Sequence, residues 1–394
     1  MHLSMWTYPW DVQDLGFDAV VADLKQRANV NTVSLATSYH AGRFLQPRSP
    51  KRKTYFPQDG TVYFKPTPSR WEGLAIQPQV ASMVDESDVL GEFTRRRDTT
   101  GLAVSCWTVC LHNMRLGLLH PGAVTCNAVG DRSPFGLCPS HPDARAYVAT
   151  LVEDVTRTYK PDVIELETPG FMGFAHGFHH EKDGVGLTAE DDLLFSLCFC
   201  PACMERSAKA GVDAAAAKRT VAQWILETCE RETPQPRWPD FPSGGLDVFR
   251  PHPEVYDFLT WRFEPVTSLV AEIRERADPA TKVYVIDLDN GWLGGGDTAQ
   301  LAKVSDGVIL CAYDKPVAEV ADLIARGRSA AGKDRYLGTG FRLFYPEMRS
   351  AHDIVERTRA AVTAGADGVN YYNYGLVPAP RLDWVRKAIA APRA

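Results

Sequence analysis

The sequence predicts a single (β/α)8 barrel, the TIM-barrel fold, over residues 1–394. Three observations support this fold class. Eight stretches with strand patterning alternate with helical segments, the second half of the chain has short and regular connections, and the chain ends on a helical segment. No G-x-G-x-x-G motif follows an early strand, so the sequence does not favour the main alternative, a doubly wound dinucleotide-binding sheet.

The predicted strands end in polar residues, and each is followed by a helical stretch. The strands are His2–Tyr8, Asn31–His40, Leu102–Asn113, Asp162–Glu167, Lys282–Asn290, Gly307–Asp314, Arg335–Phe344 and Asp367–Gly375. Helical spacing is clearest over residues 20–28, 90–101, 144–159, 253–277, 317–332, 351–366 and 382–391. Long insertions are expected after the second strand (about 41–84), after the third strand, and after the fourth strand (about 168–250).

Composition restricts the classes of partner. With 45% hydrophobic and 23% charged residues, the chain has enough apolar residues for a large core. The net charge of -6 and the pI near 6.0 argue against nucleic acid or an anionic membrane as the main partner. We expect no signal peptide and no membrane span. Nine cysteines, several of them in predicted strands, indicate a reducing, cytoplasmic location.

Active sites of TIM barrels lie at the carboxyl ends of the strands, where this sequence places many polar residues. Trp6, Asn113 and Asn370 are three of them. The residues predicted to bind substrate are Tyr8, His40, His112, Glu165, Asp287, Tyr313, Arg342 and Asn373.

Carboxylates at two neighbouring strand ends predict acid/base chemistry. Alternation places Glu165 and Glu167 on one side of the fourth strand, and Asp287 and Asp289 on one side of the fifth. If both sides face the barrel interior, the crowded charges raise at least one pKa, which provides an acid beside a base. We predict Glu167 as the catalytic acid, with Asp289 first and Asp314 second as the other carboxylate. The alternative interpretation is that such acids are ion-paired and only support the core.

The motif CFCPAC places Cys198, Cys200 and Cys203 at C-x-C-x-x-C spacing. Three thiolates at this spacing can supply three ligands to a tetrahedral Zn2+. Cys138, in the sequence GLCPSHP, is the best fourth ligand by position. Such a closed four-cysteine site would be structural. The alternative is a set of buried free thiols.

A histidine-rich loop follows the fourth strand and leaves two other functions open. His176, His179 and His180, with Glu181, could hold a catalytic metal, which would indicate a metal-dependent hydrolase or lyase. The third hypothesis is a non-catalytic sugar-binding barrel whose acids are locked in salt bridges. Its aromatic groove would be built by Trp6, Trp10, Trp107 and Trp292. No motif indicates an organic cofactor.

These residues resemble the barrel glycoside hydrolases, most nearly the family forty-two β-galactosidases. In that family a glutamate at the end of the fourth strand is the acid/base, a position matched by Glu167. The resemblance also implies a structural zinc bound by the CFCPAC cysteines and Cys138, and it covers about residues 136–206. Two departures mean that β-galactosidase activity is not implied. Leu166 replaces the family's asparagine, and the seventh strand ends near Arg342, with Glu347 only later in the loop.

The sequence therefore predicts a glycoside hydrolase-like enzyme that cleaves a glycosidic bond by carboxylate acid/base chemistry at the carboxyl ends of the strands. Its partner would be a carbohydrate or glycoside, with no nucleic acid and no membrane. The sugar, the linkage, the stereochemical outcome and the oligomeric state, including a homo-oligomer, are left open by the sequence.

Overall fold

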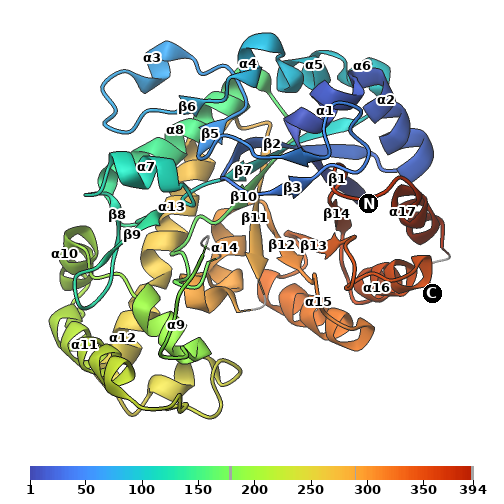
Figure 1. Cartoon of the computed structure of the whole chain (residues 1–394). Coiled ribbons are helices and arrows are strands. Elements are labelled where there is room, and N and C mark those ends of the chain that lie inside the picture. The colour runs from blue at the N-terminus through green and yellow to red at the C-terminus, as the bar shows by residue number, and fades with distance from the viewer. Residues whose placement is uncertain (177–179, 289, 392–394) are drawn as a thin grey trace.

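The computed structural model describes residues 1–176, 180–288 and 290–391, and it confirms the predicted (β/α)8 barrel (Figure 1). Eight parallel strands close on themselves because β1 pairs with both β14 and β2. In barrel order they are β1 (His2–Thr7), β2 (Thr32–Tyr39), β7 (Ala103–Val109), β10 (Val163–Glu167), β11 (Lys282–Leu288), β12 (Gly307–Cys311), β13 (Tyr336–Arg342) and β14 (Gly368–Tyr372).

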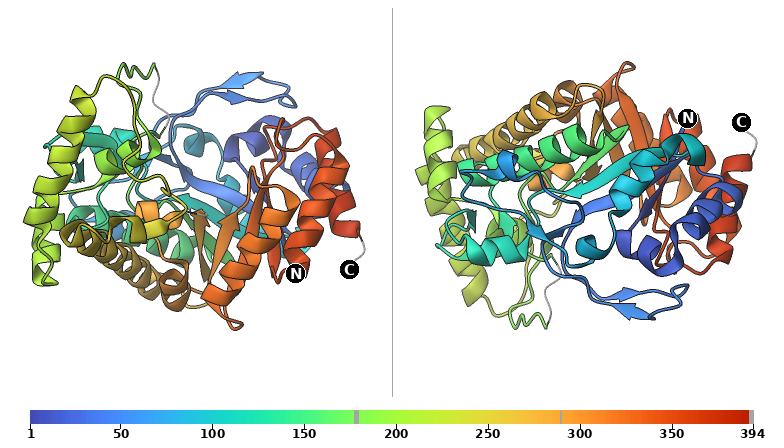
Figure 2. Two further views of the ribbon diagram at one scale, coloured as in Figure 1. Left: turned by 90° about the horizontal axis from the view of Figure 1, so that it is seen from below. Right: turned by 90° about the horizontal axis from the view of Figure 1, so that it is seen from above.

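Helices surround the barrel. Those packed around the strands are α1 (Pro9–Leu15), α2 (Phe17–Ala22), η1 (Asp23–Ala28), α5 (Val89–Arg95), α6 (Arg97–Thr100), α8 (Pro142–Tyr159), α13 (Phe263–Arg276), α14 (Thr298–Val304), α15 (Val317–Ala331), α16 (Ala351–Thr363) and α17 (Pro380–Ala390). Helix α17 packs against η1, so the last helix and the first strand lie on the same side of the molecule (Figures 1 and 2).

Three long connections carry further elements. After β2 come β3 (Phe44–Leu45), β4 (Thr54–Tyr55), β5 (Thr61–Val62), α3 (Pro68–Trp71), β6 (Gln79–Val80) and α4 (Met83–Glu86); the β3–β4 ribbon projects from the barrel (Figure 2). After β7 come α7 (Met114–Leu119), β8 (Val124–Cys126) and β9 (Arg132–Leu137). After β10 come α9 (Ala189–Ser196), α10 (Pro201–Lys209), α11 (Ala214–Glu230), η2 (Gly245–Phe249) and α12 (Pro253–Trp261), which gather beside the barrel (Figure 1). Helix η3 (Gly291–Gly294) follows β11.

The core has two layers, set by the alternation of side chains along each strand. Met5, Ile164, Leu166 and Val285 point outward and pack under the helices. The second cluster fills the barrel and is rich in aromatic residues: Trp6, Tyr8, Trp10, Ala36, Tyr39, Phe44, Tyr63, Trp107, Val109, Val163, Tyr284, Ile309 and Cys311 belong to it. Because this filling lies on the inward side of the strands, it identifies which residues face the barrel interior.

Strand β2 carries a bulge that changes which residues face inward. Its register against β7 shifts between Ala36 and Ser38, which pair with Trp107 and Thr108. A bulge adds one residue to one strand, so the side-chain alternation changes phase beyond it. As a result Ala36 and Tyr39, three residues apart, both belong to the interior cluster.

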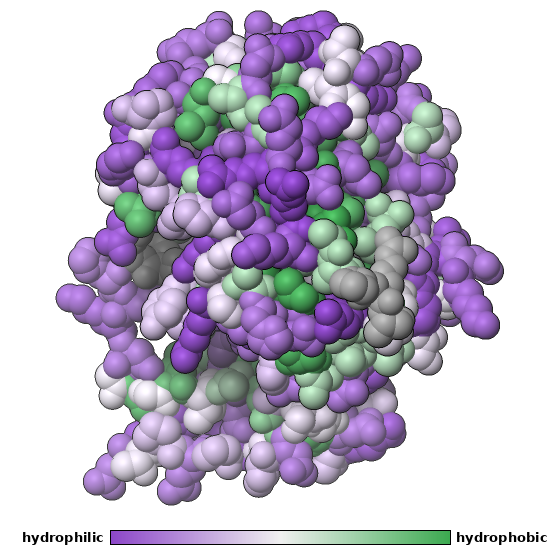
Figure 3. Space-filling model, turned by 90° about the vertical axis from the view of Figure 1, so that its right-hand side faces the viewer, coloured by the Kyte–Doolittle hydropathy of each residue, from purple (hydrophilic) through white to green (hydrophobic). Residues whose placement is uncertain are grey.

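One face of the molecule shows the character of its surface. The face in Figure 3 is largely hydrophilic, with hydrophobic residues in small scattered groups. Across the described ranges, no helix combines the length and the apolar character needed to cross a bilayer.

Candidate active site and cysteine cluster

Glu165 lies inside the barrel, fully buried, and its carboxyl group accepts four hydrogen bonds from four different strands. The donors are Trp6 Nε1 (2.7 Å), Ser34 Oγ (2.8 Å), Ser105 Oγ (2.8 Å) and Asn370 Nδ2 (3.0 Å). Burial raises the pKa of Glu165, and the four donors oppose that rise because they stabilise the ionised form. We call the carboxyl ends of the strands the mouth of the barrel. With both carboxyl oxygens hydrogen-bonded, Glu165 links four strands just below this mouth.

Glu167, the last residue of β10, lies one layer above Glu165 and is half-buried at this mouth. Its Oε2 accepts a hydrogen bond from Trp107 Nε1. Burial raises the pKa of Glu167 to about 7; the Trp107 bond lowers it, and the charge of Glu165 raises it further. A carboxyl group with a pKa near neutrality can be protonated at physiological pH and can therefore donate a proton to a reacting oxygen.

Three tyrosine hydroxyls meet beside Glu167. Tyr8 Oη lies 3.0 Å from Tyr39 Oη and 2.7 Å from Tyr372 Oη, and the last two are 3.5 Å apart. Burial raises the pKa of each phenol, and the Glu167 carboxylate contributes to that rise for Tyr39 and Tyr372. All three are therefore neutral hydroxyls that can donate as well as accept a hydrogen bond.

The mouth at β13 is cationic and aromatic. The Arg342 guanidinium lies 4.7 Å from the Tyr313 ring centre, and its Nη1 is 3.3 Å from Oε1 of Glu347. Glu347, in the loop after β13, has a side chain only 21% exposed. Its Oε2 is buried, and no hydrogen-bond partner for it occurs within the described part of the chain. The loop thus returns a carboxylate to the strand end that lacks one in the sequence.

The aspartates of β11 and β12 lie elsewhere. Register pairs Glu165 with Tyr284, so Tyr284 and Ile286 share the inward side and Asp287 faces outward. Asp287 accepts hydrogen bonds from Leu288 N and Thr298 Oγ1, both 2.9 Å, so the expectation that it joins Glu165 and Glu167 at one site is wrong.

Of the other two predicted catalytic carboxylates, Asp289 lies outside the described residues. Asp314 is exposed, whereas its neighbour Tyr313 is half-buried and stands over Arg342. Tyr313 and Asp314 point to opposite sides, and the structure thus turns Tyr313 and not Asp314 toward the mouth.

Three histidines from different connections pack together at the rim. The ring centre of His112 lies 4.2 Å from that of His40 and 4.4 Å from that of His176. Burial lowers the pKa of all three and brings that of His112 to about 2, so they are neutral imidazoles at physiological pH. His179 lies outside the described residues, and His180 is exposed.

The remaining predicted residues are buried in structural roles. Asn113 caps α7 by accepting a hydrogen bond from Leu116 N (2.9 Å). Asn373 is fully buried and accepts one from Gly375 N (2.9 Å). Trp6, Trp10 and Trp107 are at most 3% exposed, so they do not form the open groove expected of a sugar-binding barrel.

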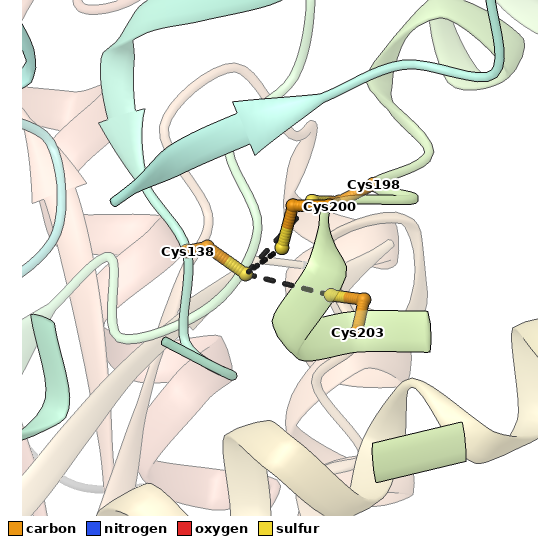
Figure 4. Close-up of side chains that lie close together, drawn as sticks. All are labelled: Cys138, Cys198, Cys200 and Cys203. Atoms are coloured by element: carbon orange, nitrogen blue, oxygen red, sulfur yellow. Dashed lines mark hydrogen bonds between the residues drawn. The ribbon is translucent and has the colours of Figure 1, made fainter. Parts of the chain in front are cut away.

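Cys138, Cys198, Cys200 and Cys203 form a buried cluster in which all four sulfurs lie within 4.8 Å of one another (Figure 4). The Sγ of Cys138 is 3.4 Å from that of Cys203, 3.6 Å from that of Cys200 and 3.8 Å from that of Cys198. Cys138 follows β9 and Cys203 lies in α10, so the cluster joins two long connections. Within the described residues this is the one group of ligand-type side chains close enough to bind a single metal ion. All nine cysteines of the chain are free thiols.

Comparison with known proteins gives the fold but no family. No protein-family model matches the sequence, and no curated protein matches it. Among solved structures, the chain is similar to the PgaB (BpsB) glycoside hydrolase domain from Bordetella bronchiseptica, with a TM-score of 0.56 and 15% identity over 99% of this chain and 97% of that domain. It is also similar to α-L-fucosidase isoenzyme 2 from Paenibacillus thiaminolyticus, with a TM-score of 0.55 and 12% identity over 94% of this chain and 45% of that enzyme.

At these identities the likeness shows the shared barrel fold. The resemblance to family forty-two and its zinc loop stays an interpretation of the sequence.

Sequence reasoning missed several residues around the two glutamates. Ser34, Ser105, Tyr39 and Tyr372 were not singled out, and Trp107 was assigned only to an open groove. A signal did exist: polar or aromatic residues occupy alternate positions of β2, β7 and β14, where a barrel interior made only for packing would carry aliphatic residues.

Proposed function

We propose that this protein is a glycoside hydrolase-like enzyme in which Glu167 is the general acid. The observation that carries the proposal is the half-buried Glu167 carboxyl at a strand end, with its pKa raised to about 7 and its orientation fixed by Trp107. Such a group protonates the leaving oxygen as a glycosidic bond breaks. Of the two similar proteins, one is a glycoside hydrolase domain and the other is an α-L-fucosidase, which supports this reaction class.

The other residues of the mouth suit a sugar. The neutral hydroxyls of Tyr8, Tyr39 and Tyr372 can hydrogen-bond ring hydroxyls, and half-buried aromatic rings such as Tyr313 offer an apolar face. Arg342 would donate hydrogen bonds to substrate oxygens from the end of β13. The predicted roles of His40 and His112 in binding substrate are retained at the rim.

A second ionisable group is needed for either stereochemical course. Asp289 keeps its place as a candidate from the sequence. Glu347 is the stronger candidate among the described residues, because it lies beside Arg342 with one oxygen buried and unpartnered there. Asp314 is exposed and Asp287 faces outward, so we do not assign catalysis to either.

The experiment compares two leaving groups. Wild type and Glu167→Gln are assayed on nitrophenyl glycosides, whose leaving group needs little protonation, and on oligosaccharides, whose alcohol leaving group needs it. General acid catalysis contributes about 10²–10⁴-fold, so Glu167→Gln should lose about that factor on the oligosaccharide and far less on the nitrophenyl glycoside. Glu230→Gln, an exposed change on α11, is the control. Near-normal turnover of the oligosaccharide by Glu167→Gln would refute the assignment.

We also propose that the four-cysteine cluster binds a structural Zn2+. Four soft sulfur donors close to one another match the ligand set of tetrahedral zinc and leave no position for a catalytic water. Backbone amides already point at the sulfurs, with Ser140 N 3.4 Å from Cys138 Sγ and Cys126 N 3.3 Å from Cys198 Sγ, which stabilises thiolates. The nine free thiols support a cytoplasmic location.

The alternative function is a metal-dependent reaction, and measuring the metal content of the protein separates it from the structural site. One zinc per chain, held by the cysteines and not needed for the chemical step, supports the structural site. A second, chelator-sensitive metal needed for turnover would instead implicate the histidines at the rim.

A further inference from the structure

Arg262, at the junction of α12 and α13, is a buried cation for which the described residues provide no carboxylate partner. Arg262 is only 1% exposed to solvent. Nη2 donates to the carbonyl oxygen of Leu293 (3.0 Å), and the guanidinium lies 4.7 Å from the centre of the Phe171 ring. Nε and Nη1 are buried and have no hydrogen-bond partner in the described part of the chain, where no acidic side chain lies within ion-pair distance of this arginine.

A guanidinium in this position needs an anion nearby. Arginine stays protonated in proteins, and an isolated buried charge destabilises the fold because it has lost its hydration. Burial lowers the pKa of Arg262 only to about 10, so it is charged at physiological pH. One carbonyl oxygen and one aromatic face are weak compensation for a full charge.

The cysteine cluster lies on the side of α12 that carries Arg262. Phe258 precedes Arg262 by four residues and therefore shares its helix face. The Phe258 ring stacks on that of Phe199, with ring centres 4.5 Å apart and planes at 10°, and Phe199 stands between Cys198 and Cys200 in the chain. Cys203, Cys198 and Cys138 lie near enough to Arg262 that their thiolate forms would favour its charged form.

We propose that Arg262 is the counter-cation of a metal–thiolate centre at the four cysteines and ties that centre to the loops beside Glu167. The proposal rests on the cluster binding metal, as proposed above. A divalent ion with four thiolates carries a net charge of about −2, and a buried cation is what such a centre requires. Arg262 is thus a positioning residue and takes no part in the reaction.

The link to the mouth runs through the loops after β10 and β11. Phe171, beneath the guanidinium, follows Glu167 by four residues, and its amide donates to the carbonyl oxygen of Gly294 (2.9 Å). Gly295 has φ 78°, and a side chain there would meet the main-chain oxygen of Arg262 at 2.8 Å. Both loops therefore pack directly on Arg262, so loss of the charge it balances would loosen them.

The test measures metal retention. The purified full chain is loaded with zinc, and release to a colorimetric chelator is followed for wild type, Arg262→Met, Arg262→Lys and the control Arg274→Met. Arg274 lies in α13, the helix that begins directly after Arg262, and pairs with Asp306 (2.8 Å), so it controls for the loss of an arginine charge from this helix. Loss of a group that supports metal ligands typically costs 10–100-fold in affinity, so Arg262→Met should release zinc at least about tenfold faster. Arg262→Lys, which keeps the charge, should stay within about threefold of wild type, and Arg274→Met should match it.

Hydrogen exchange gives the second readout. Amide exchange over residues 168–175 and 291–296 should rise in Arg262→Met, and metal removal from wild type should produce the same rise. Should Arg262→Met fail to fold, Arg262→Gln replaces it, because glutamine keeps a donor for Leu293 while it removes the charge.

Two failures are distinguishable. If folded Arg262→Met or Arg262→Gln released zinc at the wild-type rate, the proposed role of Arg262 would be overturned, while the zinc site itself would stand. A wild-type protein that binds no zinc would instead overturn the metal proposal on which this inference rests.

Discussion

Replacement of Glu167 by glutamine should stabilise the protein at neutral pH, although the same change is expected to slow oligosaccharide turnover as proposed above. In the folded chain burial raises the pKa of Glu167 from 4.5 to about 7. A raised carboxyl pKa means that the folded state binds the proton more tightly than the unfolded chain does. Its contribution to stability is complete below pH 4.5 and is lost progressively as the pH rises to about 7.

The magnitude follows from the pKa difference. A difference of about 2.5 corresponds to roughly 3 kcal/mol of unfolding free energy. This value is an upper limit, because Glu167 is half-buried and water near the carboxylate weakens the penalty. The glutamine variant has no such pH dependence at this position, and its amide oxygen can still accept the Trp107 hydrogen bond. The stability difference between variant and wild type should therefore grow by about 2–3 kcal/mol between pH of about 4 and pH of about 8.

Urea denaturation of both proteins at several pH values measures this difference. Titration of every other group is common to the two proteins and cancels in the comparison. Glu230→Gln, exposed on α11, should follow wild type at every pH. A variant-to-wild-type difference that is flat with pH, or that favours wild type as the pH rises, would refute the idea that burial holds Glu167 in its protonated form.

Three further changes probe the same framework. Trp107→Phe removes the donor that stabilises ionised Glu167, so the alkaline limb of the pH–rate profile should move up by about one pH unit; an unmoved limb would show that the bond does not set the pKa. Glu165→Ala leaves four buried donors without their acceptor and should lower the unfolding free energy by about 3 kcal/mol or more, measured in urea; a loss below about 1 kcal/mol would contradict its role as the tie between strands. Cys200→Ser should reduce bound zinc to well below one ion per chain by elemental analysis, whereas Cys229→Ser, at an exposed cysteine, should retain it.

The sequence was sufficient to predict the barrel, because each strand is indicated by its local pattern of apolar residues and by the helical segment that follows it. Pattern alone also placed Glu165 and Glu167 on one side of β10, since alternation is a property of one strand. It could not decide which side of β11 faces inward. That choice depends on the pairing of Glu165 with Tyr284, a relation between strands more than 100 residues apart, and it turned Asp287 outward.

Loop geometry set the other limit. The sequence shows Glu347 five residues beyond Arg342, but only the folded loop returns its carboxylate to within 3.3 Å of the guanidinium. The approach of His176 to His112 and His40 likewise depends on a long connection whose path has no periodic signal. The cysteine cluster was predictable from the sequence, because the short intervals of C-x-C-x-x-C hold three thiols close together whatever the fold.

The bulge in β2 shows how much of the mouth depends on a single residue of main chain. If β2 instead paired with β7 in regular register from Ala36 onward, with no bulge and the same chain length, the alternation would turn the Ser38 hydroxymethyl group inward and send Tyr39 to the outer layer. The phenol that meets Tyr8 and Tyr372 would then be lost, although all eight strands could still pair. Gain or loss of the bulge in a strand of unchanged length would therefore exchange the side chains that line the mouth while the pairing of the eight strands stays in place.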